Sequence, residues 1–95
     1  MFRIDVTPEA VDDLRVLRKT DQQRIVAEID DQHQADQTTR NRKRLRPNKL
    51  AEWELRVDEF RVFYDIDAEA PAVKIKAIGE KRGSKLFVHG QEYEL

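Results

Sequence analysis

A ten-residue segment, Arg40–Lys49, carries six basic side chains and no carboxylate. The chain as a whole has 18 basic and 19 acidic side chains, which leaves a net charge of −7 outside this segment and +6 inside it. The positive charges of this segment repel one another, and a bound anion would stabilise it. Nucleic-acid phosphates and the carboxylates of an acidic protein are the expected anions. A solvated, partly disordered basic loop would explain the same composition.

Two more arginines, Arg56 and Arg61, are predicted to face each other across a hairpin. Alternating apolar residues flank Asp58–Glu59, which has the length of a two-residue turn, and this turn places the two arginines opposite each other. Facing like charges cost roughly 0.2–1 kcal/mol unless an anion lies between them. Diagonal ion pairs with Glu54 and Asp65 are the structural alternative.

Further basic side chains are expected on the same face of the sheet. Lys74 and Lys76 alternate with apolar residues on the next predicted strand, and Lys81, Arg82 and Lys85 follow in a predicted loop. Three separate basic clusters that meet on one surface favour a polyanionic ligand over a set of structural ion pairs.

Aromatic side chains are expected beside these cations. Phe63 has the same strand parity as Arg61 and is predicted to be exposed, with Phe87 close to it. Rings among arginines would stack on unpaired bases. Burial under a terminal segment or a partner chain is the alternative for Phe63. Trp53 is expected in the core, and His89 is interpreted as a turn residue.

The first half of the chain predicts a strand and two helices. Phe2–Val6 alternates apolar and polar residues, as a half-buried strand does. Thr7 is the expected N-cap of the first helix, with Pro8 at its first position. The predicted apolar stripe of this helix is Ala10, Val11, Leu14 and Leu17. Thr20 and Gln23 match a capping box for a second helix. The predicted buried side of that helix is Ile25, Val26, Ile29 and His33.

The second half changes to a period of two residues, which predicts strands. These are expected at 53–57, 60–66 and 73–77, followed by a loop at 79–83 and a short strand or hairpin up to residue 95. The predicted fold class is therefore α+β. A four-stranded antiparallel sheet with the order β-α-α-β-β-β packs on an N-terminal helical hairpin and carries a short C-terminal extension.

Length and composition limit the class of protein. We expect residues 1–95 to form a single domain, with 39% hydrophobic and 39% charged residues. No apolar run is long enough for a membrane span or a signal peptide, and a cytoplasmic location is expected. With no cysteine and two histidines, neither a disulfide nor a metal site is expected. No cofactor is predicted.

Four segments together resemble the RelE/ParE toxins of type II toxin–antitoxin systems. They are Arg40–Arg46, Trp53–Val57, Phe60–Ile66 and Ala77–Arg82. They occur in the order and at the spacing usual in these toxins, so the resemblance extends over essentially the whole chain. It implies the same α+β fold and a cognate antitoxin as partner.

The RelE-like branch of these toxins enters the ribosome and cuts mRNA by attack of the substrate's own 2′-hydroxyl group. The protein then orients the phosphate, offsets its negative charge and moves protons. The resemblance implies catalytic roles for Arg61, Arg56, Lys81 and Arg82. The other expected RNA-contacting residues are Arg42, Lys43, Arg44, Arg46, Phe63, Lys74, Lys76 and Phe87.

The proton-transfer residue is the least defined part of this resemblance. RNA-cutting relatives often carry lysines where this chain has Glu52 and Glu54, and a Tyr or His where it has Phe87. Glu54, His89 or Tyr93 could take that role. The alternatives are a ParE-like inhibitor of DNA gyrase that acts by binding, and a non-toxic binding protein with the same fold.

Overall fold

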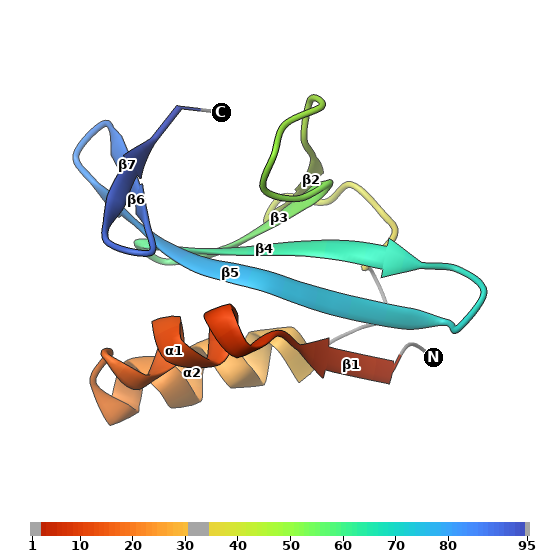
Figure 1. Cartoon of the computed structure of the whole chain (residues 1–95), viewed down its shortest axis with the longest axis horizontal. Coiled ribbons are helices and arrows are strands. Elements are labelled where there is room, and N and C mark those ends of the chain that lie inside the picture. Colours follow the sequence, from red (N-terminus) through yellow and green to blue (C-terminus); the bar gives the residue numbers. More distant parts are fainter. Residues whose placement is uncertain (1–2, 31–34, 95) are drawn as a thin grey trace.

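Two helices cover one face of a strongly bent sheet (Figure 1). A computed structural model of the chain describes residues 3–30 and 35–94. Within these residues the helices are α1 (Pro8–Arg15) and α2 (Lys19–Asp30). The strands are β1 (Arg3–Val6), β2 (Arg42–Arg44), β3 (Trp53–Val57), β4 (Phe60–Asp67), β5 (Ala72–Arg82), β6 (Lys85–Val88) and β7 (Gln91–Tyr93). The predicted α+β class is confirmed.

The strands of the described residues form one sheet in the order β2-β3-β4-β5-β6-β7, and β1 pairs with β5. Neighbours along this path are antiparallel, whereas β1 runs parallel to the first half of β5. The hairpin β6–β7 confirms the predicted C-terminal extension. Strand β2 was not predicted, because its Arg-Lys-Arg sequence has no apolar alternation. The predicted loop at 79–83 was also wrong, since β5 continues to Arg82.

Helix α1 begins as the sequence predicts. The Thr7 hydroxyl oxygen accepts a hydrogen bond from the Ala10 amide at 3.3 Å, and Pro8 occupies the first turn. Thr7 also donates from its hydroxyl group to the Lys76 carbonyl oxygen at 3.2 Å, which ties the helix start to β5. The helix ends at Arg15, so Leu17 follows it rather than belonging to it, and packs against the core from there.

Helix α2 differs from its prediction in two respects. It begins at Lys19, so Thr20 lies inside the first turn and is not the N-cap. The Gln22 amide donates to the Arg18 carbonyl oxygen at 2.9 Å. Ile25 and Ile29 are buried as predicted, whereas Val26 is 44% exposed. His33 lies outside the described residues, as does Phe2 of the predicted first strand.

The sheet has an apolar core on each face. The core under the helices contains Trp53, Tyr64 and Ile75, with Ala10 and Ile25 from the helices. The second core, on the opposite face, is made by Ala51, Phe63, Ala77, Leu86 and Val88. The segment after β2, residues 45–50, covers it with Leu45 and Leu50. Strand β7 covers it with Tyr93. The sequence predicted the first core and not the second.

A β-bulge explains part of this difference. Phe63 pairs with Ala77 and Tyr64 with Ile75, which leaves Lys76 as the extra residue on β5. An extra residue shifts the alternation of side chains by one position. Ile75 and Ala77 therefore point to opposite faces, although their spacing predicted a shared one.

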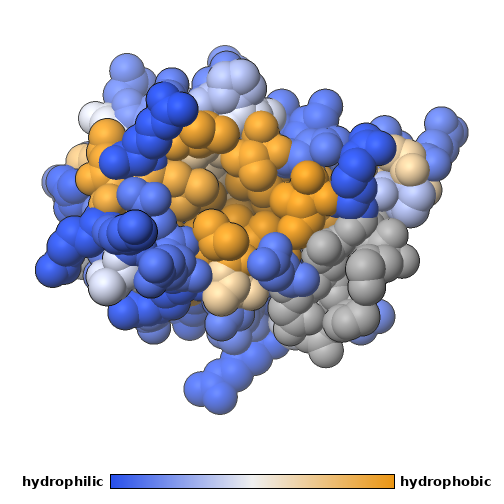
Figure 2. Space-filling model, turned by 90° about the horizontal axis from the view of Figure 1, so that it is seen from below, coloured by the Kyte–Doolittle hydropathy of each residue, from blue (hydrophilic) through white to orange (hydrophobic). Residues whose placement is uncertain are grey.

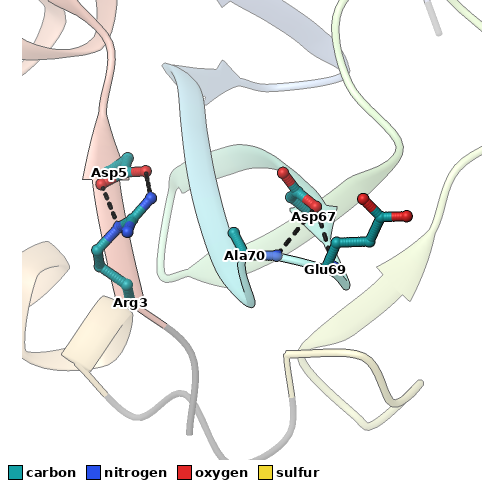
Figure 3. Close-up of polar contacts among 5 residues, drawn as sticks. All are labelled: Arg3, Asp5, Asp67, Glu69 and Ala70. Atoms are coloured by element: carbon teal, nitrogen blue, oxygen red, sulfur yellow. Dashed lines mark hydrogen bonds and ion pairs between the residues drawn. The ribbon is translucent and has the colours of Figure 1, made fainter.

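The far end of the β4–β5 ribbon is closed by local polar contacts (Figure 3). One carboxylate oxygen of Asp67 accepts hydrogen bonds from the Glu69 and Ala70 amides at 3.0 and 3.3 Å. On the adjacent β1, Arg3 donates twice to the carboxylate of Asp5, each time at 3.1 Å. The Asp67 contacts fix the turn between β4 and β5, and the Arg3–Asp5 pair lies within β1 beside it.

Candidate functional site

A groove of about 960 Å³ lies on the sheet face away from the helices. Its floor comes from β3, β4 and β5, and its two walls are the segment after β2 and the C-terminal hairpin, which stand apart in Figure 1. The lining residues are Lys43, Arg44, Leu45, Arg46, Pro47, Asn48, Glu54, Arg56, Arg61, Lys81, Ser84, Lys85, Leu86, Glu92, Tyr93 and Glu94. Basic side chains from five strands, β2 to β6, and from the loop after β2 therefore meet in one concavity.

The two arginines of the floor lie as the hairpin register predicts. Arg56 pairs directly with Arg61 across β3 and β4, and both line the groove. Arg61 is only 6% exposed, and one of its guanidinium nitrogens donates to the carbonyl oxygens of Asp58 and Phe60 at 2.7 and 2.8 Å. Burial lowers the pKa of Arg61, and the nearby charge of Arg56 lowers it further. Arg61 thus fixes the hairpin end, while Arg56 is exposed.

Glu54 provides partial neutralisation of this floor. Its carboxylate lies 3.9 Å from the Arg61 Nε and 3.8 Å from the Lys43 Nζ, and its side chain is largely buried. Asp65, the other carboxylate expected to offset the arginines, accepts a hydrogen bond from the Glu52 amide instead. The predicted ion-pair lattice is therefore present in part, and it leaves Arg56 without a carboxylate partner among the described residues.

The basic segment after β2 is ordered by its own contacts. The Asn48 side-chain oxygen accepts from the Leu50 and Ala51 amides at 2.7 and 3.0 Å. Its amide nitrogen donates to the carbonyl oxygens of Arg46 and Ala51 at 2.7 and 2.9 Å. Since Leu45 and Leu50 also pack on the second core, this segment is a fixed wall of the groove rather than a solvated loop.

Arg42 does not lie in the groove, contrary to the prediction. It pairs with Leu55, whose side chain points to the helices, so its own side chain points there too. Its guanidinium lies 5.7 Å from the centre of the Tyr64 ring and donates to the Tyr64 hydroxyl at 3.2 Å. Tyr64 in turn donates to the Ala35 carbonyl oxygen at 2.8 Å, and burial raises the pKa of this phenol. Arg42 is a structural residue of the first core.

The prediction that Phe63 is exposed was also wrong, and the alternative, burial under a terminal segment, is confirmed. Its side chain is completely buried in the second core, and it pairs with Ala77. The parity argument placed it on the correct face, but the C-terminal hairpin and the segment after β2 cover that face at this position. Phe63 therefore cannot stack on a base.

Arg82 and Phe87 lie in a small cleft beside α1, on the other face from the groove. The Arg82 guanidinium is 5.0 Å from the centre of the Phe87 ring and 3.5 Å from the Glu80 carboxylate. His89, in the same cleft, lies with its Nδ1 2.8 Å from an Asp13 carboxylate oxygen. Alternation along β5 separates Arg82 from Lys81, which faces the groove.

The two lysines of β5 differ from each other in position. Lys74 lies outside the groove, in the part of β5 that pairs with β1 and with Asp65 of β4. Lys76 lines a smaller groove of about 390 Å³ on the other side of the basic segment. Lys85, which was expected on this face, lines the larger groove, whereas the sequence did not predict that Ser84, Glu92 and Glu94 would line it. The only signal for them was the turn at Gly90, which returns β7 beside β6.

Gly79 allows the C-terminal wall to lie close to β5. A Cβ atom at this position would lie 2.9 Å from the Phe87 carbonyl oxygen and 2.9 Å from a methyl group of Val88. The absence of a side chain thus permits the pairing of β6 that places Lys81 and Lys85 at the groove.

Within residues 3–30 and 35–94, no three His, Cys, Asp or Glu side chains are grouped closely enough to hold a metal ion. None of the helices in this part of the chain is long and apolar enough to cross a membrane. Of the three candidates for proton transfer, Glu54 and Tyr93 line the groove and His89 does not.

A comparison with known protein families matches residues 4–84 to the family described as ParE toxin of type II toxin–antitoxin system, parDE. The chain belongs to this family. No curated protein matches the sequence. The protein is therefore a toxin of the ParE/RelE group, and its partner is a cognate antitoxin. The family match does not distinguish RelE-like mRNA cleavage from ParE-like inhibition of gyrase. The choice between these two activities depends on the chemistry of the groove.

The helical side of the toxin presents a different surface. Figure 2 shows this side, with an apolar band across its middle and polar groups around it. Val16, directly after α1, is 84% exposed, and Val26 of α2 is 44% exposed. The toxin thus has a polar, basic groove on one face of the sheet and an exposed apolar surface over the helices on the other.

Proposed function

We propose that the groove binds and cleaves mRNA on the ribosome, as in RelE-like toxins. One observation carries the proposal. Three cations without a carboxylate partner among the described residues, Arg46, Arg56 and Lys81, line the same groove as a carboxylate, Glu54, and a phenol, Tyr93. RNA transesterification requires cations that hold the phosphate, a group that accepts a proton and a group that donates one.

The proposed reaction takes its nucleophile from the substrate. Glu54 accepts the proton of a ribose 2′-hydroxyl group, and that oxygen attacks the adjacent phosphorus. The bond to the 5′-oxygen of the next nucleotide breaks, and Tyr93 donates a proton to the leaving oxygen. The products are a 2′,3′-cyclic phosphate and a free 5′-hydroxyl group. Arg56 and Lys81 contact the non-bridging oxygens, where negative charge develops.

Arg61 has an indirect role in this proposal. Its hydrogen bonds to two backbone carbonyl oxygens hold its guanidinium under the floor. A charge in such a poorly hydrated position contributes to the potential at the phosphate more strongly than an exposed one does. Arg61 therefore strengthens phosphate binding through its field.

Inhibition of DNA gyrase by binding is the second candidate, and two observations favour it. The family match is to ParE toxins. The carboxylate of Glu54 is also already engaged, since it lies 3.8 Å from the Lys43 Nζ and 3.9 Å from the Arg61 Nε, so a structural role explains its presence in the groove. A toxin of this kind would need the groove for contact only.

Purified toxin in a reconstituted translation reaction tests the proposal. We expect cleavage of a reporter mRNA inside its translated codons, and no change in the supercoiling activity of gyrase. Glu54→Gln keeps the size of the side chain but removes the proton acceptor, and it should slow cleavage by about 10²–10⁴-fold.

Thermal melting of Glu54→Gln serves as the control that the variant is folded. Intact mRNA together with inhibited gyrase would replace the proposal by the second candidate. Intact mRNA with active gyrase would indicate a binding protein without toxicity.

A further inference from the structure

The basic segment after β2 separates two grooves. The larger, of about 960 Å³, lies toward the C-terminal hairpin, and the smaller, of about 390 Å³, lies toward Lys76 of β5. Residues 44–48 line both grooves. The segment is fixed by Asn48 and by the packing of Leu45 and Leu50, so it forms a rigid ridge between them.

The cations of this surface fall into two groups. In the first group, each cation has a polar partner, and two of them share Glu54: Lys43 with Glu54, Arg44 with Glu52, Lys85 with Glu92, and Arg61 with two carbonyl oxygens and Glu54. In the second group, no carboxylate lies within ion-pair distance among the described residues. Its members are Lys81, Arg56, Arg46, Lys49 and Lys76.

The second group extends across both grooves. Lys81 and Arg56 line the larger groove, Lys49 and Lys76 line the smaller one, and Arg46 lines both. The two carboxylates of the smaller groove are already engaged, since Glu52 pairs with Arg44 and Asp65 accepts from the Glu52 amide. In the larger groove Glu54 and Glu92 pair with cations, and Glu94 is the carboxylate there that no cation pairs with among the described residues. Available cations thus lie on both sides of the ridge and on the ridge itself.

We propose that a single strand of RNA crosses this ridge. Its phosphates contact Lys81 and Arg56 on one side, Arg46 on the ridge, and Lys49 and Lys76 on the other side. The inference rests on the proposed function for the class of ligand, and it adds the path of the strand and the residues that contact it. The cations that already have partners, Arg61 among them, do not contact the RNA phosphates in this proposal.

A single strand fits this path better than a duplex or a folded acidic protein. A ridge with a groove on each side requires a backbone that bends over a short distance, which an unpaired strand does. The rings of Phe63 and Trp53 are buried, so Tyr93 is the aromatic side chain available in the larger groove. Contacts to phosphate therefore dominate, and we expect little preference for particular bases.

The salt dependence of binding measures the number of phosphates contacted. The probe is a fluorescent ten-nucleotide RNA with 2′-O-methyl groups throughout, which cannot be cleaved by 2′-hydroxyl attack. Five contacts predict that the logarithm of the association constant falls with log[salt] with a slope of about −3.5, at about −0.7 per phosphate. Arg46→Gln and Lys76→Gln should each flatten the slope by about 0.7 and weaken binding about fivefold at 0.1 M salt.

Two further variants make the test specific. Arg15→Gln removes the same charge from α1 on the other face and should leave the slope unchanged. Arg44→Gln removes a cation two positions from Arg46 whose charge is already offset by Glu52, and it should change the slope much less than Arg46→Gln does.

Three results would overturn the inference. They are an effect of Arg44→Gln as large as that of Arg46→Gln, a slope unaffected by Lys76→Gln, and variants that weaken binding of the antitoxin but not of the RNA. The predicted slopes together with uncleaved mRNA in the translation reaction would leave the path intact and reject the cleavage activity.

Discussion

Replacing Phe63 by alanine is expected to lower the free energy of unfolding by about 3–5 kcal/mol. The ring is completely buried, and the second core around it contains few other large side chains. Its loss leaves a cavity between Ala51, Ala77 and Leu86, on which both walls of the groove rest. A domain of this size has a total stability of about 5–15 kcal/mol, so the variant should be close to unfolding.

Urea denaturation followed by the fluorescence of Trp53, the single tryptophan, measures this effect. Val16→Ala is the control, since Val16 is 84% exposed, and it should change stability by less than about 0.5 kcal/mol. If Phe63→Ala cost no more than Val16→Ala, Phe63 would not be the centre of a second core, and the walls of the groove would need another support.

Replacing Arg56 by glutamate should reduce mRNA cleavage by at least about 100-fold without unfolding the toxin. The substitution reverses the charge on the exposed side of the groove floor, where we propose that the phosphate lies. It also places a carboxylate directly opposite Arg61, which removes a repulsion between like charges worth roughly 0.2–1 kcal/mol. Activity and stability are therefore expected to change in opposite directions.

Cleavage in the translation reaction and a thermal melt of the same preparation together test this prediction. Arg15→Glu makes the same change of charge on α1 and should keep its activity. A variant Arg56→Glu that cleaves at the normal rate would show that the phosphate does not lie on the floor between β3 and β4. A melting temperature well below that of the wild-type protein would show that Arg56 has a structural role.

The elements that position the site could be predicted where short-range patterns determine them. Thr7 and Pro8 define the start of α1, because capping depends on neighbouring backbone groups. The turn at Asp58 and Glu59 sets the register of β3 and β4, and so the pairing of Arg56 with Arg61. Period-two alternation then identifies the face of the sheet on which these arginines lie.

The rest depends on contacts between distant segments, which alternation does not determine. Phe63 was assigned to the correct face, but its burial results from segments more than ten residues away on either side. A single bulge at Lys76 reversed the face of Ala77. Arg42 was predicted to contact RNA because of its charge. Its burial depends on Tyr64, which lies 22 positions further along the chain and which local patterns do not place beside it.

Nuclear magnetic resonance can show directly whether RNA binds to the groove side of the toxin. The probe is the same 2′-O-methyl RNA, added to isotope-labelled toxin while backbone amide shifts are followed. We expect the shifted amides to lie at or next to the residues that line the two grooves, which are 43–52, 54, 56, 61, 65, 76, 81, 84–86 and 92–94. Shifts confined to α1 and α2, or no shifts at low salt, would contradict it.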